Sequence, residues 1–425
     1  MSMNIQEALR YINSSAWFGG KKDLSRITGL LSRLGDPQKR LKTVHIAGTN
    51  GKGSCAAMTA SVLKTAGYRT GLFTSPYLYR FHERMRIDGE EIGDEALANC
   101  ITRVRTAAET MEEHPNAFEM MTATAFLWFA EEQCDITVLE TGLGGRLDAT
   151  NVITDPEAVV IMNIGLDHTK ILGNSIEEIA AEKAGIIKPG SDCVLYQQQE
   201  EAAREVISAV CRKQGAKLHE ADFSQITPEF DSLEGQVFSY RGESYALPLL
   251  GACQRRNAAV VIELAGVLRR RGWKISSTAL EHGLYAVSWP ARFEILSDDP
   301  YFVLDGGHNP QCAQEVEENL RHYFPGQKHI LLAGVLRDKD VQALFSALDR
   351  TADEYICISP GSDRAMSAQD LAEVLMPFGK PVTACETIAE GVELARQRAK
   401  KTRGMVCATG SLYMAGEIRF YFGCY

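Results

Sequence analysis

The segment whose residue types and spacing most clearly suit a chemical function is a glycine-rich turn that follows an apolar run beginning at Lys42. It reads Gly48-Thr49-Asn50-Gly51-Lys52-Gly53-Ser54, and a helix of small residues is expected from Cys55 to about Ala66. Glycines let backbone N–H groups converge on an anion, a helix start adds partial positive charge, and Lys52 adds a full charge. The Ser54 hydroxyl is of the kind that ligates phosphate-bound Mg²⁺. The order of strand, turn and helix therefore predicts a phosphate-binding loop formed by residues 48–54.

The spacing of this loop differs from the strict pattern G-x-x-x-x-G-K-[ST]. Counting back from Gly51-Lys52 puts the first glycine of that pattern at Ile46, and Gly53 separates the lysine from Ser54. A glycine-rich turn that binds no nucleotide is the alternative interpretation. The loop alone leaves both open, so other parts of the chain must discriminate between them.

Further predicted strands of the N-terminal half also end in polar or glycine-rich sequence, at Thr74-Ser75, Glu140–Asp148 and Asp167-His168. In open parallel sheets, ligands collect beyond the carboxyl ends of the strands. A carboxylate, an imidazole and hydroxyls at this edge predict a Mg²⁺ site beside a bound triphosphate. The candidate metal ligands are Ser54, Ser75, Glu140 and His168. The alternatives are a salt-bridged Glu140 and a His168 that only caps or donates a hydrogen bond.

Lys183 lies in a predicted helix that a capping box, Ser175-x-x-Glu178, would open. Its immediate neighbours favour a surface lysine paired with Glu182 or Glu178.

In the C-terminal half, a predicted strand ends in a glycine-rich segment that contains Asp305 and His308. Arg292 lies in a connector, where it could reach a phosphate or be an ordinary surface arginine. Gln254 and Asn257 open a predicted helix, and their amides could cap it or contact a purine.

The chain must position these residues with alternating strands and helices, which indicates a mainly parallel sheet. Strands are predicted near residues 69–74, 136–139, 158–164 and 194–196, and helices within 1–41 and near 94–112, 117–132, 201–214 and 254–271. We expect an ordered loop at Trp17–Lys22, a loop or short hairpin over Tyr79–Glu91, and a hairpin over 234–247. A second α/β unit is expected from Phe293, with strands near 301–304, 329–333, 354–358, 381–385 and 405–408, and helices near 311–323, 340–349, 368–376 and 388–401.

The bulk composition limits the class of protein. A chain of 425 residues exceeds what one core usually supports, so two domains are expected, over 1–288 and 289–425. A net charge of −10 without a basic run argues against nucleic acid as a partner. The eleven cysteines are scattered without a C-x-x-C, which indicates neither a zinc ribbon nor a disulfide framework. The absence of a signal-like or long apolar segment predicts a cytoplasmic protein that does not associate with a membrane.

Several motifs together resemble folylpolyglutamate synthase and the related bifunctional dihydrofolate synthase, members of the Mur ligase superfamily. They occur in the order of that family and extend over nearly the whole chain. Besides His45–Ser54, they are Gly71-Leu-Phe-Thr-Ser-Pro76, Glu140-Thr-Gly-Leu-Gly-Gly-Arg-Leu-Asp-Ala-Thr-Asn151, Asn163-Ile-Gly-Leu-Asp-His-Thr169, Glu182-Lys-Ala-Gly-Ile-Ile-Lys-Pro-Gly190, Asp305-Gly-Gly-His-Asn-Pro310 and Ala408-Thr-Gly-Ser-Leu-Tyr413.

The resemblance implies an α/β fold with an N-terminal, mainly parallel P-loop-type ATPase domain, a smaller Rossmann-like C-terminal domain, and ATP held between them. It places Lys183 on a lysine that the family carbamylates, and we adopt this role over the surface interpretation. The residues that it implies for ATP are Gly48, Thr49, Asn50, Gly51, Lys52, Gly53, Ser54, Asn257, Arg292, Asp305 and His308. Those implied for catalysis are Lys52, His168, Lys183 and Arg292. Those implied for the pteroate part of a folate are Asn116, Phe118, Glu119, Leu147, Asp148 and Ala149.

The expected activity is ATP-dependent addition of L-glutamate to the γ-carboxylate of a reduced folate through an acyl phosphate. Dihydropteroate is a further acceptor to consider. ATP and Mg²⁺ are the expected cofactors, K⁺ is compatible with the site, and a monomer is expected. The alternatives are a Mur-type ligase for another carboxylate, a P-loop kinase or hydrolase, and a non-catalytic nucleotide-binding regulator. A cell-wall Mur ligase usually has a nucleotide-sugar domain before the loop, whereas about forty residues precede it here.

The chain departs from the family pattern at a few positions. Tyr77 replaces the histidine of T-S-P-H-L, Gly307 replaces the alanine of D-G-A-H-N-P, and Thr141 replaces the valine of V-G-L-G-G. Only Tyr77 is a large change, and it affects what is expected of the pterin side of the substrate pocket.

Overall fold

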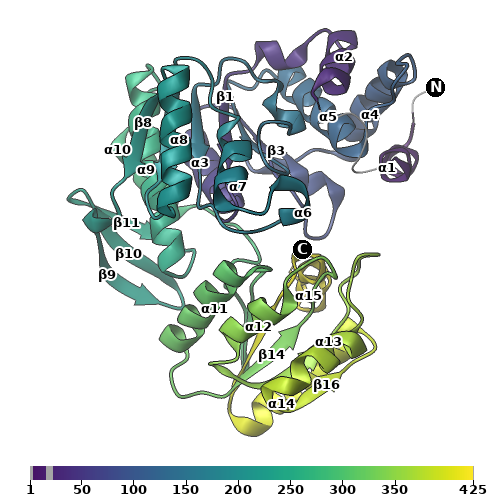
Figure 1. The fold of residues 1–425 in the computed structure, drawn as a ribbon, viewed down its shortest axis with the longest axis vertical. Coiled ribbons are helices and arrows are strands. Elements are labelled where there is room, and N and C mark those ends of the chain that lie inside the picture. The colour runs from purple at the N-terminus through teal and green to yellow at the C-terminus, as the bar shows by residue number, and fades with distance from the viewer. Residues whose placement is uncertain (1–2, 16–22, 425) are drawn as a thin grey trace. The chain divides into compact units, whose positions relative to one another are not determined.

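The computed structural model describes residues 3–15 and 23–424, so the loop predicted at Trp17–Lys22 lies outside the described residues. The chain forms two compact units. Unit 1 consists of the described parts of Met1–Thr227 together with Ser239–Tyr245 and Arg256–Val287. Unit 2 consists of Pro228–Phe238, Ala246–Arg255 and the described part of Ser288–Tyr425. Figure 1 shows the elements of each unit.

Unit 1 contains an eight-stranded sheet with helices around it. Its strands are β1 (Thr43–Ala47), β2 (Thr70–Phe73), β3 (Met85–Ile87), β4 (Glu90–Glu91), β5 (Ile136–Glu140), β6 (Ala158–Ile161), β7 (Asp192–Tyr196) and β8 (Lys217–Ala221). Its helices are α1 (Ile5–Ser14), α2 (Ser25–Arg33), α3 (Lys52–Thr65), α4 (Asp94–Ala108), α5 (Ala117–Glu131), α6 (Thr169–Leu172), α7 (Ile176–Ala184), α8 (Glu201–Gln214), most of α9 (Ala252–Arg270) and α10 (Ser277–Tyr285).

The order of the strands in this sheet brings the predicted site segments together. The order is β4-β3-β2-β5-β1-β6-β7-β8, and all strands from β2 to β8 in that order pair in parallel. The four strands that precede the predicted site segments, β2, β5, β1 and β6, are therefore direct neighbours. Their carboxyl ends lie at one edge, with β1 and its phosphate loop near the middle.

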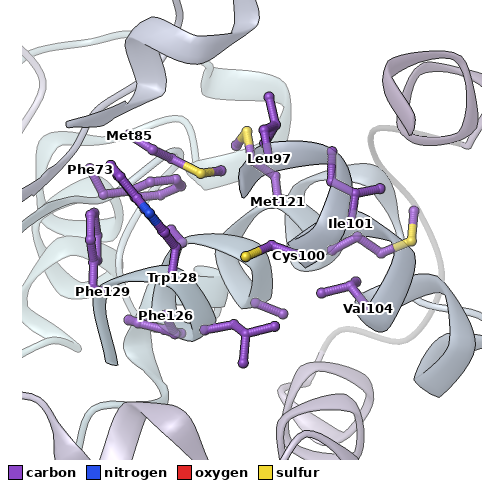
Figure 2. Packing of buried hydrophobic residues seen from close by; sticks show 14 of the residues in the cluster. Phe73, Met85, Leu97, Cys100, Ile101, Val104, Met121, Phe126, Trp128 and Phe129 are labelled. Atoms are coloured by element: carbon purple, nitrogen blue, oxygen red, sulfur yellow. The ribbon is translucent and has the colours of Figure 1, made fainter. Parts of the chain in front are cut away.

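The core of unit 1 forms because α5 and the central strands are mostly apolar and are buried along nearly their whole length. The strands β1, β5 and β6 are buried at every residue, as expected for a parallel sheet covered on both faces. A large cluster joins α1, α2, α4 and α5 to the sheet, and Figure 2 shows Phe129 of α5 near Phe73 of β2. This packing holds the first turn of α5 beside the site edge.

Unit 2 has a six-stranded sheet of order β12-β13-β17-β14-β15-β16, in which only β12 is antiparallel to its neighbour. Its strands are β12 (Glu294–Asp298), β13 (Tyr301–Leu304), β14 (His329–Ala333), β15 (Ala352–Cys357), β16 (Val382–Ala384) and β17 (Met405–Thr409). Its helices are α11 (Pro310–Tyr323), α12 (Val341–Leu348), α13 (Ala368–Leu375), α14 (Ile388–Thr402) and α15 (Ala415–Tyr421). A three-stranded sheet of β9 (Ile226–Ser232), β10 (Gly235–Tyr240) and β11 (Glu243–Leu247) contributes residues to both units.

Most predicted elements are confirmed, with differences at their ends. Helix α3 begins at Lys52 rather than Cys55, so the end of the loop is already helical. Strand β6 ends at Ile161 rather than Ile164, because the backbone beyond it bonds to the phosphate loop instead of continuing the sheet. The capping box at Ser175 is only half formed, since the Glu178 carboxylate accepts the N–H of Asn174.

The elements that the sequence did not predict are short, polar or at a sheet edge. They are β8, β9, β12, α6, α10 and α15. None of the helices formed by residues 3–15 and 23–424 has both the length and the apolar character needed to span a bilayer.

Candidate functional site

The phosphate loop is a helix start with uncommitted backbone donors. Gly51 caps α3 in a left-handed conformation, with φ of 84°. The N–H of Cys55 donates to the Gly51 carbonyl at 2.9 Å, which leaves the N–H groups of Lys52, Gly53 and Ser54 without a partner inside the helix. Donors of this kind, together with the helix dipole, favour an anion at this position.

Two loop glycines are required by their neighbours. A Cβ on Gly48 would lie 2.6 Å from Cβ of Met162, and one on Gly51 would lie 2.8 Å from Oδ1 of Asn257. Asn257, which the resemblance assigned to ATP, is therefore in direct proximity to the loop. Only glycine permits this close approach of the loop to Met162 and Asn257.

Two lysines converge on one carbonyl of the loop. The ammonium of Lys52 donates to the carbonyl oxygens of Gly48 and Thr49 at 3.0 and 3.1 Å. The ammonium of Lys183 donates to the same Gly48 oxygen at 2.8 Å. Burial, together with the nearby positive charge of Lys52, lowers the pKa of Lys183 from 10.5 to about 7. The structure therefore brings an amine that is partly neutral near pH 7 to the phosphate loop.

The interpretation of Lys183 as a surface lysine is wrong. Lys183 is 4% exposed. Glu182 instead pairs with Arg146 at 2.6 Å, and Glu178 accepts the N–H of Asn174. Lys183 lies on the buried face of α7, one turn from Ile179 and Ala180, so the helix carries it into the unit rather than outward.

The ends of β6 and β1 are joined by backbone hydrogen bonds. The carbonyl of Asn163 accepts the N–H of Thr49 at 2.7 Å and that of Asn50 at 3.2 Å. The Thr49 hydroxyl lies within hydrogen-bond distance of both the N–H and the carbonyl of Gly165, at 3.0 and 3.1 Å. The segment that leads to His168 thus determines the conformation of the phosphate loop.

Two of the predicted metal ligands lie next to each other. The carboxylate of Glu140, which is buried, accepts the backbone N–H of Ser75 at 3.1 Å. Ser54 is also buried, in the first turn of α3. His168 has a left-handed backbone with φ of 51°, and its N–H donates to the Asp167 carboxylate at 2.8 Å. Its imidazole remains 35% exposed.

The donor set at this edge suits Mg²⁺ better than a metal held by protein alone. Among residues 3–15 and 23–424, His, Cys, Asp and Glu form no cluster of three or more that could hold a metal ion. Mg²⁺ is commonly held by one or two carboxylates, by water and by substrate phosphates. Glu140 with the hydroxyls of Ser54 and Ser75 matches that sparse, oxygen-rich pattern.

The residues predicted to contact the pteroate group have mainly structural partners. Asn116 and Glu119 form a reciprocal capping box at the start of α5. The Glu119 carboxylate also forms a buried ion pair with Arg26, at 3.1 Å. Phe118 packs directly on Gly142, where a Cβ would lie 2.3 Å from its ring. The first turn of α5 is therefore fixed against the segment that follows Glu140.

The segment 147–149 is held by a buried network. Asp148 accepts the N–H groups of Leu143 and Thr150 at 2.9 and 3.0 Å. The Thr150 hydroxyl bonds to Nε2 of His45 at 2.8 Å, and burial lowers the pKa of His45 to about 3. Ala149 is buried and Leu147 is partly exposed. These contacts assign Asp148 a positioning function within the loop.

Tyr77, the departure from the family pattern, stacks against a cation. The guanidinium of Arg84 lies 4.8 Å from the centre of the Tyr77 ring. The centres of the Tyr77 and Phe81 rings are 6.3 Å apart. A cation–π contact of this kind holds the aromatic ring in place.

The predicted residues of unit 2 gather at the carboxyl end of β13. The Asp305 carboxylate accepts the N–H groups of Phe293 and Gly307 at 2.8 and 2.7 Å. Burial raises the pKa of Asp305, and the positive charge of Arg292 opposes that rise. The Arg292 guanidinium donates to the Ala291 carbonyl at 3.2 Å, and Nδ1 of His308 lies 3.0 Å from the Gly306 carbonyl.

The backbone of segment 162–165 and the Met162 side chain contact the phosphate loop, a role that the sequence did not predict. Backbone contacts leave no residue-type signal. The burial of Lys183 did have a signal, because Ile176, Ile179, Ala180 and Ile187 share its helical face or the turn beyond it.

Comparison with known proteins identifies the family of the chain. Residues 46–265 match the Mur ligase middle domain, and residues 291–412 match the glutamate ligase domain of Mur ligases. The dihydrofolate synthase/folylpolyglutamate synthase of Bacillus subtilis is 36% identical over 97% of this chain and 98% of its own. The folylpolyglutamate synthase of Lacticaseibacillus casei is 36% identical over 98% of each chain.

Solved structures show the same fold. The folylpolyglutamate synthase of Mycobacterium tuberculosis, complexed with ADP and AMPPCP, has a TM-score of 0.90 at 31% identity over 99% of this chain and 98% of its own. Escherichia coli FolC in complex with DHPP and ADP has a TM-score of 0.88 at 28% identity over the same shares. The chain belongs to the folylpolyglutamate synthase and dihydrofolate synthase family of Mur ligases.

Proposed function

We propose that this protein is an ATP-dependent ligase that joins the amino group of L-glutamate to the γ-carboxylate of a reduced folate or folylpolyglutamate. The observation that carries the proposal is the phosphate loop at the shared edge of β2, β5, β1 and β6, with two lysines at its Gly48 carbonyl. Family membership supplies the reaction class. A kinase, a hydrolase or a regulator accounts less well for relatives that are synthases over almost their whole length.

The reaction needs an activated carboxylate, because a carboxylate is a poor electrophile toward an amine. Transfer of the γ-phosphoryl group of ATP to a carboxylate oxygen gives an acyl phosphate and ADP. The glutamate nitrogen then attacks the acyl carbon, loses a proton, and forms the amide as the C–O bond to phosphate breaks. The protein acts by positioning the reactants and by stabilising negative charge.

The residues of unit 1 have distinct proposed roles in that chemistry. The free N–H groups at the start of α3 bind the phosphates, and Lys52 moves from the loop carbonyls to neutralise the transferred group. Ser54, Ser75, Glu140 and His168 would hold Mg²⁺, which would supply positive charge to offset the negative charge of the phosphates. K⁺ is a further cation compatible with this oxygen-rich edge.

Lys183 is proposed to be carbamylated. Its neutral amine attacks CO₂, loses one proton and becomes an N-carboxylate. A pKa of about 7 makes the neutral amine available at ordinary pH. The product would replace a buried cation beside Lys52 with an anion, which removes the repulsion between the two ammonium groups.

For the remaining residues, Asn257, Arg292, Asp305 and His308 are proposed to contact ATP, and Arg292 to stabilise the transferred phosphoryl group. Phe118 and Leu147 are the proposed pteroate contacts with side chains partly exposed. The proposed pteroate-contacting surface is held in place by Asn116, Glu119, Asp148 and Ala149.

We also place the domain boundary between residues 288 and 289 and expect a monomer.

Dihydropteroate is the second candidate acceptor, and its ligation to L-glutamate would give dihydrofolate. Relatives named for both activities favour it, as does the complex of Escherichia coli FolC with DHPP and ADP. All eleven cysteines lie in the described residues and are outside any disulfide, so we propose a reducing compartment such as the cytoplasm.

The proposed activity is tested by ADP release from the purified protein with ATP, Mg²⁺ and L-glutamate. One reaction contains dihydropteroate and the other a reduced folylmonoglutamate. Release with the folate alone identifies a polyglutamate synthase, and release with both identifies a bifunctional enzyme. Release with neither acceptor contradicts the proposal.

A further inference from the structure

A glutamine of the loop after β7 has a bidentate contact that the reaction chemistry does not use. Oε1 of Gln199 accepts the N–H of Ile164 at 3.0 Å, and its Nε2 donates to the Met162 carbonyl at 3.0 Å. Because one partner is a donor and the other an acceptor, the orientation of the amide is determined. The side chain spans the backbone on either side of Asn163.

The Gln199 contact lies just beyond the point at which the pairing of β6 with β7 ends. Strands β6 and β7 pair only as far as Ile161 and Leu195. Beyond that point the chain turns tightly, with the N–H of Gln199 donating to the Gln197 carbonyl at 2.8 Å. The Gln199 side chain thus supplies the hydrogen bonds that a continued β7 would have given to the backbone after β6.

The segment that Gln199 holds also bonds to the phosphate loop. Between its two partners, the Asn163 carbonyl accepts the N–H groups of Thr49 and Asn50 at 2.7 and 3.2 Å. The Met162 side chain fills the space left by the missing Cβ atoms of Gly48 and Gly51, at 2.6 and 3.0 Å. A shift of this segment would therefore be transmitted to the loop through hydrogen bonds and through packing.

We infer that Gln199 is a positioning residue for nucleotide binding, acting through Asn163 and Met162 on the phosphate loop. It need not touch the nucleotide itself. The inference rests on the proposed function, which supplies the nucleotide bound by the loop. The hydrogen bonds that connect Gln199 to the loop through residues 162–164 are present without any ligand. A merely structural role would lower stability without a selective effect on nucleotide affinity.

The substitution Gln199→Met tests this, since methionine has a similar length but neither hydrogen-bonding group. We expect about tenfold weaker ADP binding by calorimetry, comparable with the loss found when a residue that orients a metal ligand is removed. The KM for ATP should rise while the KM for L-glutamate stays unchanged. Gln198→Met, at the exposed neighbouring position, is the matched control and should bind ADP like the unaltered protein.

Gln199→Glu provides a second variant if Gln199→Met does not fold. It retains an acceptor for Ile164 but places a carboxylate oxygen against the Met162 carbonyl, so ADP affinity should still fall. A folded variant whose ADP affinity stays within twofold of the unaltered protein overturns the inference.

Amide hydrogen exchange separates this inference from the proposed function, because it needs no nucleotide. Loss of the Gln199 contact should speed exchange at Thr49 and Asn50 more than in strands β7 and β5. Failure of the unaltered protein to bind ADP would contradict the proposed function alone. Unchanged exchange at the loop in folded Gln199→Met would contradict the positioning role alone.

Discussion

The ammonium groups of Lys52 and Lys183 donate to the same oxygen, the backbone carbonyl of Gly48, at 3.0 and 2.8 Å. Two like charges share this acceptor in a largely buried site, and the pKa of Lys183 is lowered as a result of burial and of Lys52. The repulsion between the two ammonium groups is removed if Lys183 is neutral or carbamylated, or if Lys52 turns toward a bound phosphate. The first predictions concern these two residues.

Lys52→Ala should reduce ligation at least about a hundredfold while the fold remains intact. The reason is the loss of a positive charge that stabilises the transferred phosphoryl group. Glutamate-dependent ADP release measures the effect, and thermal unfolding checks the fold. Lys64→Ala, at an exposed position of the same helix, is the control and should be fully active. Normal turnover by the Lys52→Ala variant would contradict the assignment of residues 48–54 as a phosphate-binding loop.

Activity should depend on dissolved CO₂ if Lys183 is carbamylated. We expect protein held in CO₂-free buffer near pH 6 to lose activity, since most of the Lys183 amine is protonated below its pKa of about 7. Added bicarbonate near pH 8 should restore it. Labelled ¹³C-bicarbonate should give a carbamate carbonyl signal in the NMR spectrum that is absent in Lys183→Met. An active enzyme without that signal would contradict the modification.

The free energy of unfolding in CO₂-free buffer should rise with pH between about 7 and 10.5 because of Lys183. In this range the unfolded chain still binds a proton at Lys183, while the folded chain has lost it, so the folded state is favoured as pH rises. Below pH 7 both states are protonated and the contribution no longer changes. Urea unfolding of the unaltered protein and Lys183→Met at pH 7 and 9 measures it. Parallel dependences in the two proteins would show that the pKa is not lowered.

Glu140→Gln should raise the Mg²⁺ concentration needed for half-maximal activity by about tenfold or more. The amide can still accept the Ser75 N–H but no longer carries the negative charge that attracts the cation. Titration of ADP release with Mg²⁺ gives this value, and Glu131→Gln on the exposed part of α5 is the control. An unchanged Mg²⁺ requirement would exclude Glu140 as a ligand.

Glu119→Ala should lower the free energy of unfolding by about 3 kcal/mol, because it leaves buried Arg26 unpaired and removes half of the capping box. The KM for folate of the folded protein should change little. Denaturant unfolding measures the loss, with Glu109→Ala, from an exposed ion pair, as a control expected to cost less than about 0.5 kcal/mol. A raised KM at unchanged stability would instead make Glu119 a substrate contact.

The sequence by itself determined the order of the elements and the polar segments that end the strands. Apolar runs that precede Gly48, Thr74, Glu140 and Asp167 are local signals, and strand ends at which ligands gather follow from the parallel sheet that they imply. The sequence motifs also identified the family. Short edge elements such as β8 and β12 escaped prediction because their half-exposed, polar residues lack a clear period.

Only the tertiary structure decided which polar side chains are available for chemistry. Glu119 and Asp148 look like free carboxylates in the sequence, but Arg26, which is far away along the chain, pairs with Glu119, and the backbone N–H of Leu143 donates to Asp148. Lys183 looks like a surface residue until the packing of α7 carries it to the Gly48 carbonyl. The physical reason is that burial, pKa and backbone contacts such as those of Gln199 depend on residues far away along the chain, whereas a motif records only its nearest neighbours.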